Sequence, residues 1–473
     1  MIKRNQSLDA LRGLAILAMV LSGSIAFGDT LPAWMYHAQV PPPDHKFIPA
    51  IAGITWVDLV FPFFLFSMGA AIPLALQKYL QAKAGWVPVL LMAARRFLLL
   101  TFFALFTHHL MAWELSAQPS PQTYLLSIGA FVLVFFQLYD NKNKKYQHLF
   151  FVLKGIAFAI AVALLYWLPF KDGRGFTLTN SDIIIIVLAN MAFFGTLIWW
   201  LTKNNPWLRI GILPFIMAVF LAAKEPGDGW AKELFNFSQV AGFHFDWMYR
   251  FYFLKYLFII IPGTFAGEWL LQFAKNSLGQ NAGVDKHITK LVSALAIALV
   301  ISNTFFLFSR HPFINLILTA AILILMFFLI NKMGKNGNSL TGNFFKAGAY
   351  LLLLGLFFEA WEGGIKKDHS TYSYYFVTSG LAFFMLMGFN GLAATKAGAA
   401  INNYLSLNGR NPMVAYIAGG LLVTPLLQVT GAITIFESMD GNAWLGFLKG
   451  VLFTGIVSLT TILFTKKGWF FKT

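Results

Sequence analysis

The 473-residue chain contains no cysteine and few charged residues. Without cysteine it can form no disulfide, no thiolate metal site and no cysteine nucleophile, so redox chemistry does not indicate its compartment. Only 11% of its residues are charged, whereas 58% are hydrophobic, and the mean hydropathy is +0.67. Such a composition leaves too little polar surface to cover a soluble globule of this length. We therefore expect an integral membrane protein.

Several short motifs and one periodicity are also missing. The sequence has neither GxGxxG nor GxxxxGK[ST], which argues against nucleotide hydrolysis, and no HExxH, so we expect no metal site. Segments of about ten residues that alternate between apolar and polar side chains are absent, which argues against a transmembrane barrel. The remaining possibility is a helical membrane protein.

Apolar runs of about 17 to 25 residues, the length that crosses a bilayer as a helix, recur along the chain. We expect an all-α, polytopic helical bundle with about fourteen spans, or as few as about ten, because some runs are short or poorly separated. The spans are predicted at 11–28, 54–77, 89–112, 122–139, 149–169, 182–202, 207–223, 251–274, 290–308, 312–331, 346–362, 374–393, 412–431 and 444–465. Residues 1–473 then form a single transmembrane domain.

Lysine and arginine are distributed unevenly among the predicted loops. If the N-terminus is cytoplasmic, most of these cations fall on the cytoplasmic side, among them Lys3, Arg4, Lys78, Lys83, Lys142, Lys466 and Lys467. This positive-inside pattern predicts that both termini are cytoplasmic and that the loop at 29–53 lies on the opposite side. The net charge of +16 is then explained by topology and anionic lipid rather than by nucleic acid.

The loop at 29–53 contains His37, four residues before three consecutive prolines, and Asp58 follows at the start of the second span. An ionisable side chain inside a membrane is costly, and it therefore marks a candidate functional site. The alternative role for Asp58 is a hydrogen bond that only fixes the packing of two helices. We interpret His37 and Asp58 as a reaction centre.

Six segments resemble the heparan-α-glucosaminide N-acetyltransferase family, in a bacterial branch of it. They are Ser7-Leu-Asp9-Ala-Leu-Arg12-Gly13, Tyr36-His37-Ala38, Asp58-Leu-Val-Phe-Pro62-Phe-Phe-Leu-Phe-Ser-Met-Gly69, Gly364-Ile-Lys-Lys367-Asp-His-Ser-Thr-Tyr-Ser373-Tyr374, Asn411-Pro-Met-Val-Ala-Tyr416 and Lys466-Lys467-Gly-Trp469-Phe. The resemblance covers roughly the first 80 and the last 110 residues.

This resemblance implies a homodimeric acyltransferase of the bacterial inner membrane. It would take acetyl from cytosolic acetyl-CoA and deliver it to the amino group of a glucosamine or related glycan fragment on the periplasmic side. His37 occupies the position of the family's essential histidine. Gly23 stands where the family has an asparagine, and one of the flanking hydroxyls, Ser22 or Ser24, could replace that amide in contacting substrate.

The chemistry of an imidazole fits this reaction. An ordinary imidazole titrates near ~6.5, close to the pH at which an aminosugar must lose a proton before it attacks a thioester. His37 could be a general base, or it could accept the acetyl group and pass it on. Asp58 could hold the ring in one tautomer, as the acid of a catalytic triad does. The sequence leaves the two routes open.

Further candidates are weaker. For binding the acceptor they are Asp44, His45, Lys367, His369 and Ser373, although a solvated loop pair is the simpler interpretation of Asp44 and His45. For the phosphates of acetyl-CoA they are Arg95, Arg96, Lys396, Arg410 and Asn411, each of which could equally be a topological anchor. Two other classes of function remain open: a proton-coupled transporter of a sugar or peptidoglycan fragment, with His37 and Asp58 as a relay, and a scaffold without chemistry.

Overall fold

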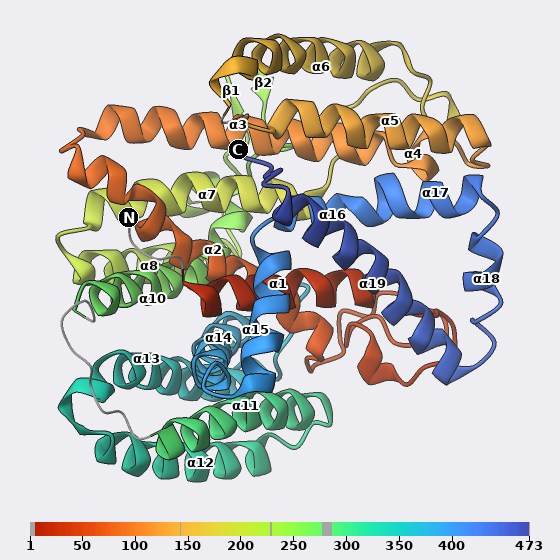
Figure 1. Cartoon of the computed structure of the whole chain (residues 1–473). Helices are drawn as coiled ribbons and strands as arrows, with labels where there is room; N and C mark the ends of the chain where they lie inside the picture. The colour runs from red at the N-terminus through yellow and green to blue at the C-terminus, as the bar shows by residue number, and fades with distance from the viewer. Residues whose placement is uncertain (1–4, 142, 228, 277–285, 473) are drawn as a thin grey trace. The chain divides into compact units, whose positions relative to one another are not determined.

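The computed structural model of the chain describes residues 5–141, 143–227, 229–276 and 286–472 (Figure 1). Lys3, Arg4 and Lys142, which belong to the predicted cytoplasmic segments, lie outside these residues. Nearly all regular structure in the described part is helical. Its strands are β1 (Gln239–Val240) and β2 (Phe243–His244), which pair antiparallel with Gln239 opposite His244. The predicted all-α, polytopic bundle is therefore confirmed.

The chain forms two compact units, which are described separately. Unit 1 comprises Met1–Ala82, Tyr256–Arg410 and Asp440–Gly450, and unit 2 comprises Lys83–Lys255, Asn411–Met439 and Val451–Thr473. Unit 1 contains α1 (Gln6–Ser22), the 3-10 turn η1 (Ala33–Met35), α2 (Trp56–Gln81), α10 (Leu257–Asn276), α11 (Lys286–Phe308), α12 (Pro312–Lys332), α13 (Gly334–Trp361), α14 (Tyr372–Leu392), α15 (Lys396–Gly409) and the first turns of α19 (Ala443–Lys466).

Unit 2 contains the remaining helices and the β-hairpin. Its helices are α3 (Trp86–His109), α4 (Ala112–Leu115), α5 (Pro121–Leu138), η2 (Lys144–Tyr146), α6 (Gln147–Trp167), η3 (Lys171–Gly173), α7 (Ile183–Thr202), α8 (Pro206–Ala222), α9 (Trp230–Asn236), most of η4 (Phe251–Tyr256), α16 (Pro412–Ala418), the π-helical η5 (Gly419–Val423), α17 (Thr424–Val429), α18 (Ile433–Glu437) and the rest of α19. Within this unit α3 packs on α7, and α5 packs on α6 and α17 (Figure 1).

Twelve helices in the described residues are long and apolar enough to cross a membrane. Each of the fourteen predicted segments overlaps a helix. The difference arises because α1 and α8 have only 17 residues each, which makes them about 26 Å long and slightly shorter than the hydrocarbon core. The chain is an integral membrane protein by these criteria.

Unit 1 differs from the prediction in the bounds of its first helix and in one additional helix. The first helix spans Gln6–Ser22 instead of 11–28, because the Asn5 side chain caps its start by accepting a hydrogen bond from the Leu8 N–H. The segment after α14, predicted as a loop, forms α15. This helix packs so closely on α1 that a Cβ on Gly13 or Gly409 would overlap the backbone of the other helix. Its small and polar residues carry no apolar signal.

The helix that begins beside His37, α2, is held by equally close backbone contact. A Cβ on Gly69 would lie 2.4 Å from the Ile260 carbonyl oxygen of α10, and one on Gly263 would lie 2.4 Å from the Phe66 carbonyl oxygen of α2. Small residues permit this approach between membrane helices. Helices α11 to α14 form a neighbouring group in unit 1, where α14 is buried along almost its whole length (Figure 1).

Candidate functional site

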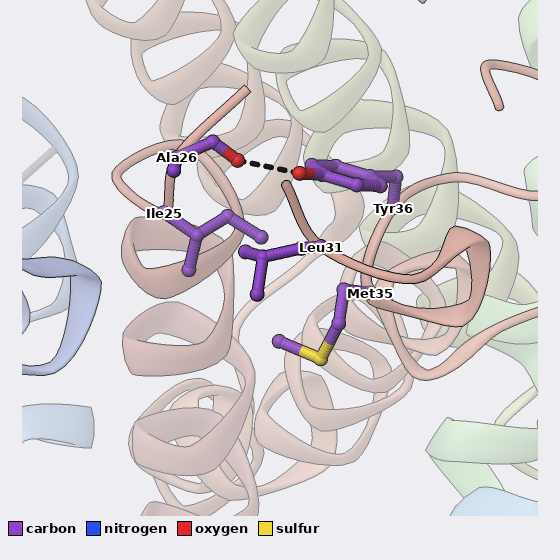
Figure 2. Packing of buried hydrophobic residues seen from close by; sticks show 5 residues of the cluster. All are labelled: Ile25, Ala26, Leu31, Met35 and Tyr36. Atoms are coloured by element: carbon purple, nitrogen blue, oxygen red, sulfur yellow. Dashed lines mark hydrogen bonds between the residues drawn. The ribbon is translucent and has the colours of Figure 1, made fainter. Parts of the chain in front are cut away.

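A small apolar cluster fixes the chain directly before His37. Its members are Ile25, Ala26, Leu31, Met35 and Tyr36, which are buried together (Figure 2). The Tyr36 hydroxyl donates a hydrogen bond to the Ala26 carbonyl and so closes the loop that they share. Burial, and to a lesser extent the negative charge of Asp440, raises the pKa of the Tyr36 phenol, so the hydroxyl stays a neutral donor. The residue after this anchor is His37.

The start of α2 holds the Asp58 carboxylate in place. Thr55 and Asp58 form a capping box in which the Thr55 hydroxyl and the Asp58 carboxylate satisfy free N–H groups of the first turn. Asp58 Oδ2 accepts hydrogen bonds from the N–H groups of Thr55, at 2.9 Å, and Ala38, at 3.2 Å. The Thr55 hydroxyl also donates to the Tyr36 carbonyl at 2.6 Å. The carboxylate therefore joins the helix start to the histidine loop.

His37 contacts the second oxygen of the same carboxylate. His37 Nδ1 lies 2.8 Å from Asp58 Oδ1, and the exposed fractions of the two side chains are 38% and 2%. A carboxylate accepts hydrogen bonds, so this contact favours the tautomer with the hydrogen on Nδ1. Nε2 then keeps its lone pair on a ring that solutes can reach. This is the arrangement of an oriented general base or nucleophile.

Lys367, from the loop between α13 and α14, completes a cluster of three ionisable side chains. Its ammonium nitrogen lies 3.1 Å from His37 Nδ1 and 3.3 Å from Nε2. The ammonium is almost equidistant from the two ring nitrogens, so it lies beside the ring and off the axis along which the Nε2 lone pair points. Lys367 therefore places a positive charge next to the ring and leaves Nε2 able to accept a proton or attack a thioester.

Gln39 fixes the distance between these two loops. Its Nε2 donates to the Asp368 carbonyl at 2.6 Å, and its Oε1 accepts from the Asp368 N–H at 2.8 Å. Gln39 is 3% exposed, so both bonds are shielded from water. Sequence reasoning did not single out Gln39, because its partner is 329 residues away along the chain. The Thr55–Asp58 spacing, in contrast, is a signature visible in the sequence.

Helix α14 supports the site from the other side of Asp58. The buried Tyr374 hydroxyl donates to the Asp58 carbonyl at 2.8 Å. Glu362 caps α14 by accepting hydrogen bonds from the N–H groups of Tyr372 and Ser373, each at 2.8 Å. Ser373, predicted to bind substrate, is fully buried and its hydroxyl donates to Thr371 at 2.8 Å. In this structure its contacts fix the start of the helix.

The other residues predicted to bind the acceptor, which are Ser24, Asp44, His45 and His369, lie in the same loops. Within the described part of the chain, none of them forms a hydrogen bond or ion pair with His37. Ser24 donates to the Val20 carbonyl at 2.8 Å at the end of α1. Asp44 is exposed and pairs with Lys46 at 3.6 Å. The His45 ring packs against Tyr36, with Nε2 at 2.9 Å from the Gly28 nitrogen.

The structure also brings His369 next to the loop at 29–53. Its exposed ring packs edge-on against Phe47, with centroids 6.1 Å apart. Thus His37, Asp58 and Lys367 form the central cluster, and His45 and His369 lie in the surrounding loops.

The five residues predicted to bind acetyl-CoA are divided between the two units. Lys396, exposed at the start of α15, and Arg410 belong to unit 1, and the others belong to unit 2. Arg95 is exposed and Arg96 is partly buried on α3. The Asn411 amide is occupied by the C-terminal tail, since it donates to the Trp469 carbonyl at 2.7 Å and accepts from the Phe471 N–H at 3.2 Å. Within the described part of the chain, no group of three or more His, Asp or Glu side chains could hold a metal ion.

Comparison with protein families places the chain in one of them. Residues 4–270 match the family described as "Domain of unknown function (DUF5009)", and since this match covers more than half of the sequence, the chain belongs to that family. A search of curated proteins found no match.

Proposed function

We propose that this family member is a membrane-embedded N-acetyltransferase, which moves acetyl from cytosolic acetyl-CoA to the amino group of an aminosugar or of a glycan or cell-wall fragment. The acceptor would bind at the opposite membrane face, which the distribution of lysine and arginine assigns to the loop at 29–53. The main observation that supports this proposal is the 2.8 Å contact between the accessible His37 imidazole and the buried Asp58 carboxylate. The likeness of these motifs to the heparan-α-glucosaminide N-acetyltransferase family supports the same proposal.

In the direct form of the proposed reaction, the acetyl group passes from the thioester to the amine in one step. The amine nitrogen attacks the thioester carbon, a C–N bond forms, the C–S bond breaks, and the coenzyme leaves as a thiolate. The proton of the attacking amine passes to His37 Nε2, and Asp58 stabilises the resulting imidazolium. In the covalent form, Nε2 attacks the thioester carbon first and the C–S bond breaks, so that the coenzyme leaves as a thiolate. The amine then attacks the acetyl carbon, the bond from that carbon to Nε2 breaks, and the released Nε2 takes up the amine proton.

Lys367 has a role in either form. The carbonyl oxygen of the acetyl group gains negative charge in the transition state, and a fixed cation close to that oxygen lowers the barrier. The Lys367 ammonium lies 3.3 Å from Nε2, the atom next to which the acetyl group must pass. We infer that it stabilises this charge.

The test is transfer of radiolabelled acetyl from acetyl-CoA to glucosamine by the purified protein. His37→Ala should abolish transfer while the variant keeps the elution profile and melting temperature of the wild type. His148→Ala is the matched control, since His148 is exposed on α6 in the other unit. Full activity of His37→Ala, or no transfer by the wild type to any aminosugar or glycan fragment, would overturn the proposal.

The same pair of residues also suits a proton-coupled transporter, because a buried carboxylate bonded to an accessible imidazole can relay a proton. Uptake of a sugar or peptidoglycan fragment into proteoliposomes separates the two functions. A transporter would drive uptake with a pH gradient and without acetyl-CoA, whereas the proposed enzyme would show no such uptake.

A further inference from the structure

A large apolar cavity in unit 1 lies beside the reaction centre. It has a volume of about 600 Å³ and is lined by side chains of α1, η1, α2, α11 and α14, among them Trp34, Thr55, Leu59, Ile301, Phe305 and Met385. Its size falls within the range of small-molecule sites, roughly 300 to 1,000 Å³. Trp34, Ile301 and Phe305 are each more than half exposed, so the cavity opens at the surface of the protein.

The lining determines what can fill this cavity. Apart from three hydroxyl groups and the indole N–H groups of Trp34 and Trp56, the side chains that line it are hydrocarbon, aromatic or thioether. Those hydroxyls already have partners, since Thr55 bonds to the Tyr36 carbonyl, Thr304 to the Val300 carbonyl and Ser309 to the His311 ring. A cavity with so few polar groups offers ordered water too few hydrogen-bond partners. The polar amides of a coenzyme arm would also be left without partners here. The chemistry therefore selects an aliphatic chain.

One side of the cavity adjoins the catalytic cluster. Thr55 lines the cavity, and its hydroxyl oxygen lies 3.3 Å from Asp58 Oδ2. Trp34, which also lines the cavity, precedes His37 by three residues. A molecule whose aliphatic chain fills the cavity would therefore have its head close to the loop that carries His37, where the exposed imidazole and the Lys367 ammonium lie together.

From this proximity, and from the apolar lining, we propose that the acceptor is a lipid: an aminosugar head attached to a long aliphatic chain, with the chain bound in this cavity. The inference rests on the proposed acetyl transfer and specifies its substrate class. The amine of the head attacks the acetyl carbon, as in the reaction above, while burial of the chain holds that amine at Nε2. Each buried methylene contributes about 0.8 kcal/mol, so the chain supplies affinity that a free sugar lacks.

The experiment compares methyl, octyl and dodecyl glucosaminides as acceptors for radiolabelled acetyl-CoA. We expect kcat/KM to rise at least about tenfold from the methyl to the dodecyl compound. Ile301→Trp, which fills the cavity from its exposed rim, should reduce the dodecyl-to-methyl ratio to nearly one. Ile324→Trp is the control, because Ile324 is 58% exposed on α12 and does not line the cavity. Partition of the longer compounds into detergent affects both variants equally.

The outcomes separate this inference from the proposed function. Transfer that is independent of chain length, or a chain-length effect that survives in Ile301→Trp, would overturn the lipid acceptor and leave acetyl transfer standing. A change of oligomeric state in Ile301→Trp with an unchanged ratio would instead make the cavity an interface between two copies, and would also overturn it.

Lack of transfer to all three compounds, together with lack of transfer to every free aminosugar and glycan fragment, would overturn the proposed function itself, whereas transfer to the free acceptors alone would overturn only the lipid acceptor. Photolabelling with a dodecyl glucosaminide that carries a diazirine in its tail then tests whether the cavity binds an amphiphile. Labelling of α11 that Ile301→Trp removes and Ile324→Trp retains would support an amphiphile in the cavity. Equal labelling of the exposed face of α12 would contradict it.

Discussion

Gln39 and Asp368 are joined by two hydrogen bonds, one in each direction, between a side chain and a backbone 329 residues apart. His37 lies two residues before one partner, and Lys367 lies immediately before the other. The pair therefore sets how closely the ammonium approaches the imidazole. Gln39 touches no substrate in this scheme and acts as a positioning residue.

Replacing Gln39 with leucine should lower kcat for acetyl transfer by about tenfold or more, because a small displacement of Lys367 weakens its effect on the transition state. The change removes both hydrogen bonds to the Asp368 backbone, and each should contribute about 0.5 to 1.5 kcal/mol to the free energy of unfolding. Steady-state kinetics and thermal unfolding measure the two effects. The comparison is Gln81→Leu, at the exposed end of α2, which should change neither. Equal kcat in both variants would remove Gln39 from this role.

Asp58→Asn should reduce turnover far more than it reduces stability. The amide can still accept hydrogen bonds from Thr55 and Ala38, so the start of α2 keeps its cap. Its NH₂ group, however, would face His37 Nδ1 and favour the tautomer that leaves no lone pair on Nε2. We expect kcat to fall roughly a hundredfold or more, as for the wrong tautomer in a triad. Unchanged turnover would show that Asp58 serves packing alone.

Lys367→Met should lower kcat by about a hundredfold, with a smaller effect on KM, because a cation aimed at a developing charge acts mainly in the transition state. Lys366→Met is the matched control, since the neighbouring lysine has no described side-chain contact with His37. A rise in KM alone for the Lys367 variant would instead assign the ammonium to binding of the acceptor.

Arg95→Glu should raise KM for acetyl-CoA by about threefold or more if this exposed arginine of α3 faces the coenzyme phosphates. The effect should weaken as salt screens the charges. Lys171→Glu, in a loop predicted on the opposite membrane face, provides the comparison. A KM unchanged at low ionic strength would exclude Arg95 from the coenzyme site.

Apolar runs predicted the helices well, because a membrane span must be both long and apolar, and all fourteen predicted segments coincide with helices. Apolar runs could not predict α15, because this helix does not pack through an apolar face. It packs on α1 through glycines that bring the two backbones into contact. The sequence indicated that His37 and Asp58 belong to one site because the loop that carries the histidine leads into the helix that carries the acid. The pairing of Gln39 with Asp368 could not be predicted, because nothing in either segment specifies a partner so distant in sequence.

The glycine contact between α2 and α10 limits how this protein can move. With Gly69 and Gly263 each facing the partner's backbone, the two helices have no side-chain layer in which to slide or rotate past one another. Any gating motion must carry them together as one rigid body, together with the acid at the tip of α2. Access to the imidazole would then be controlled by the flanking loops, while the acid keeps its orientation throughout the cycle.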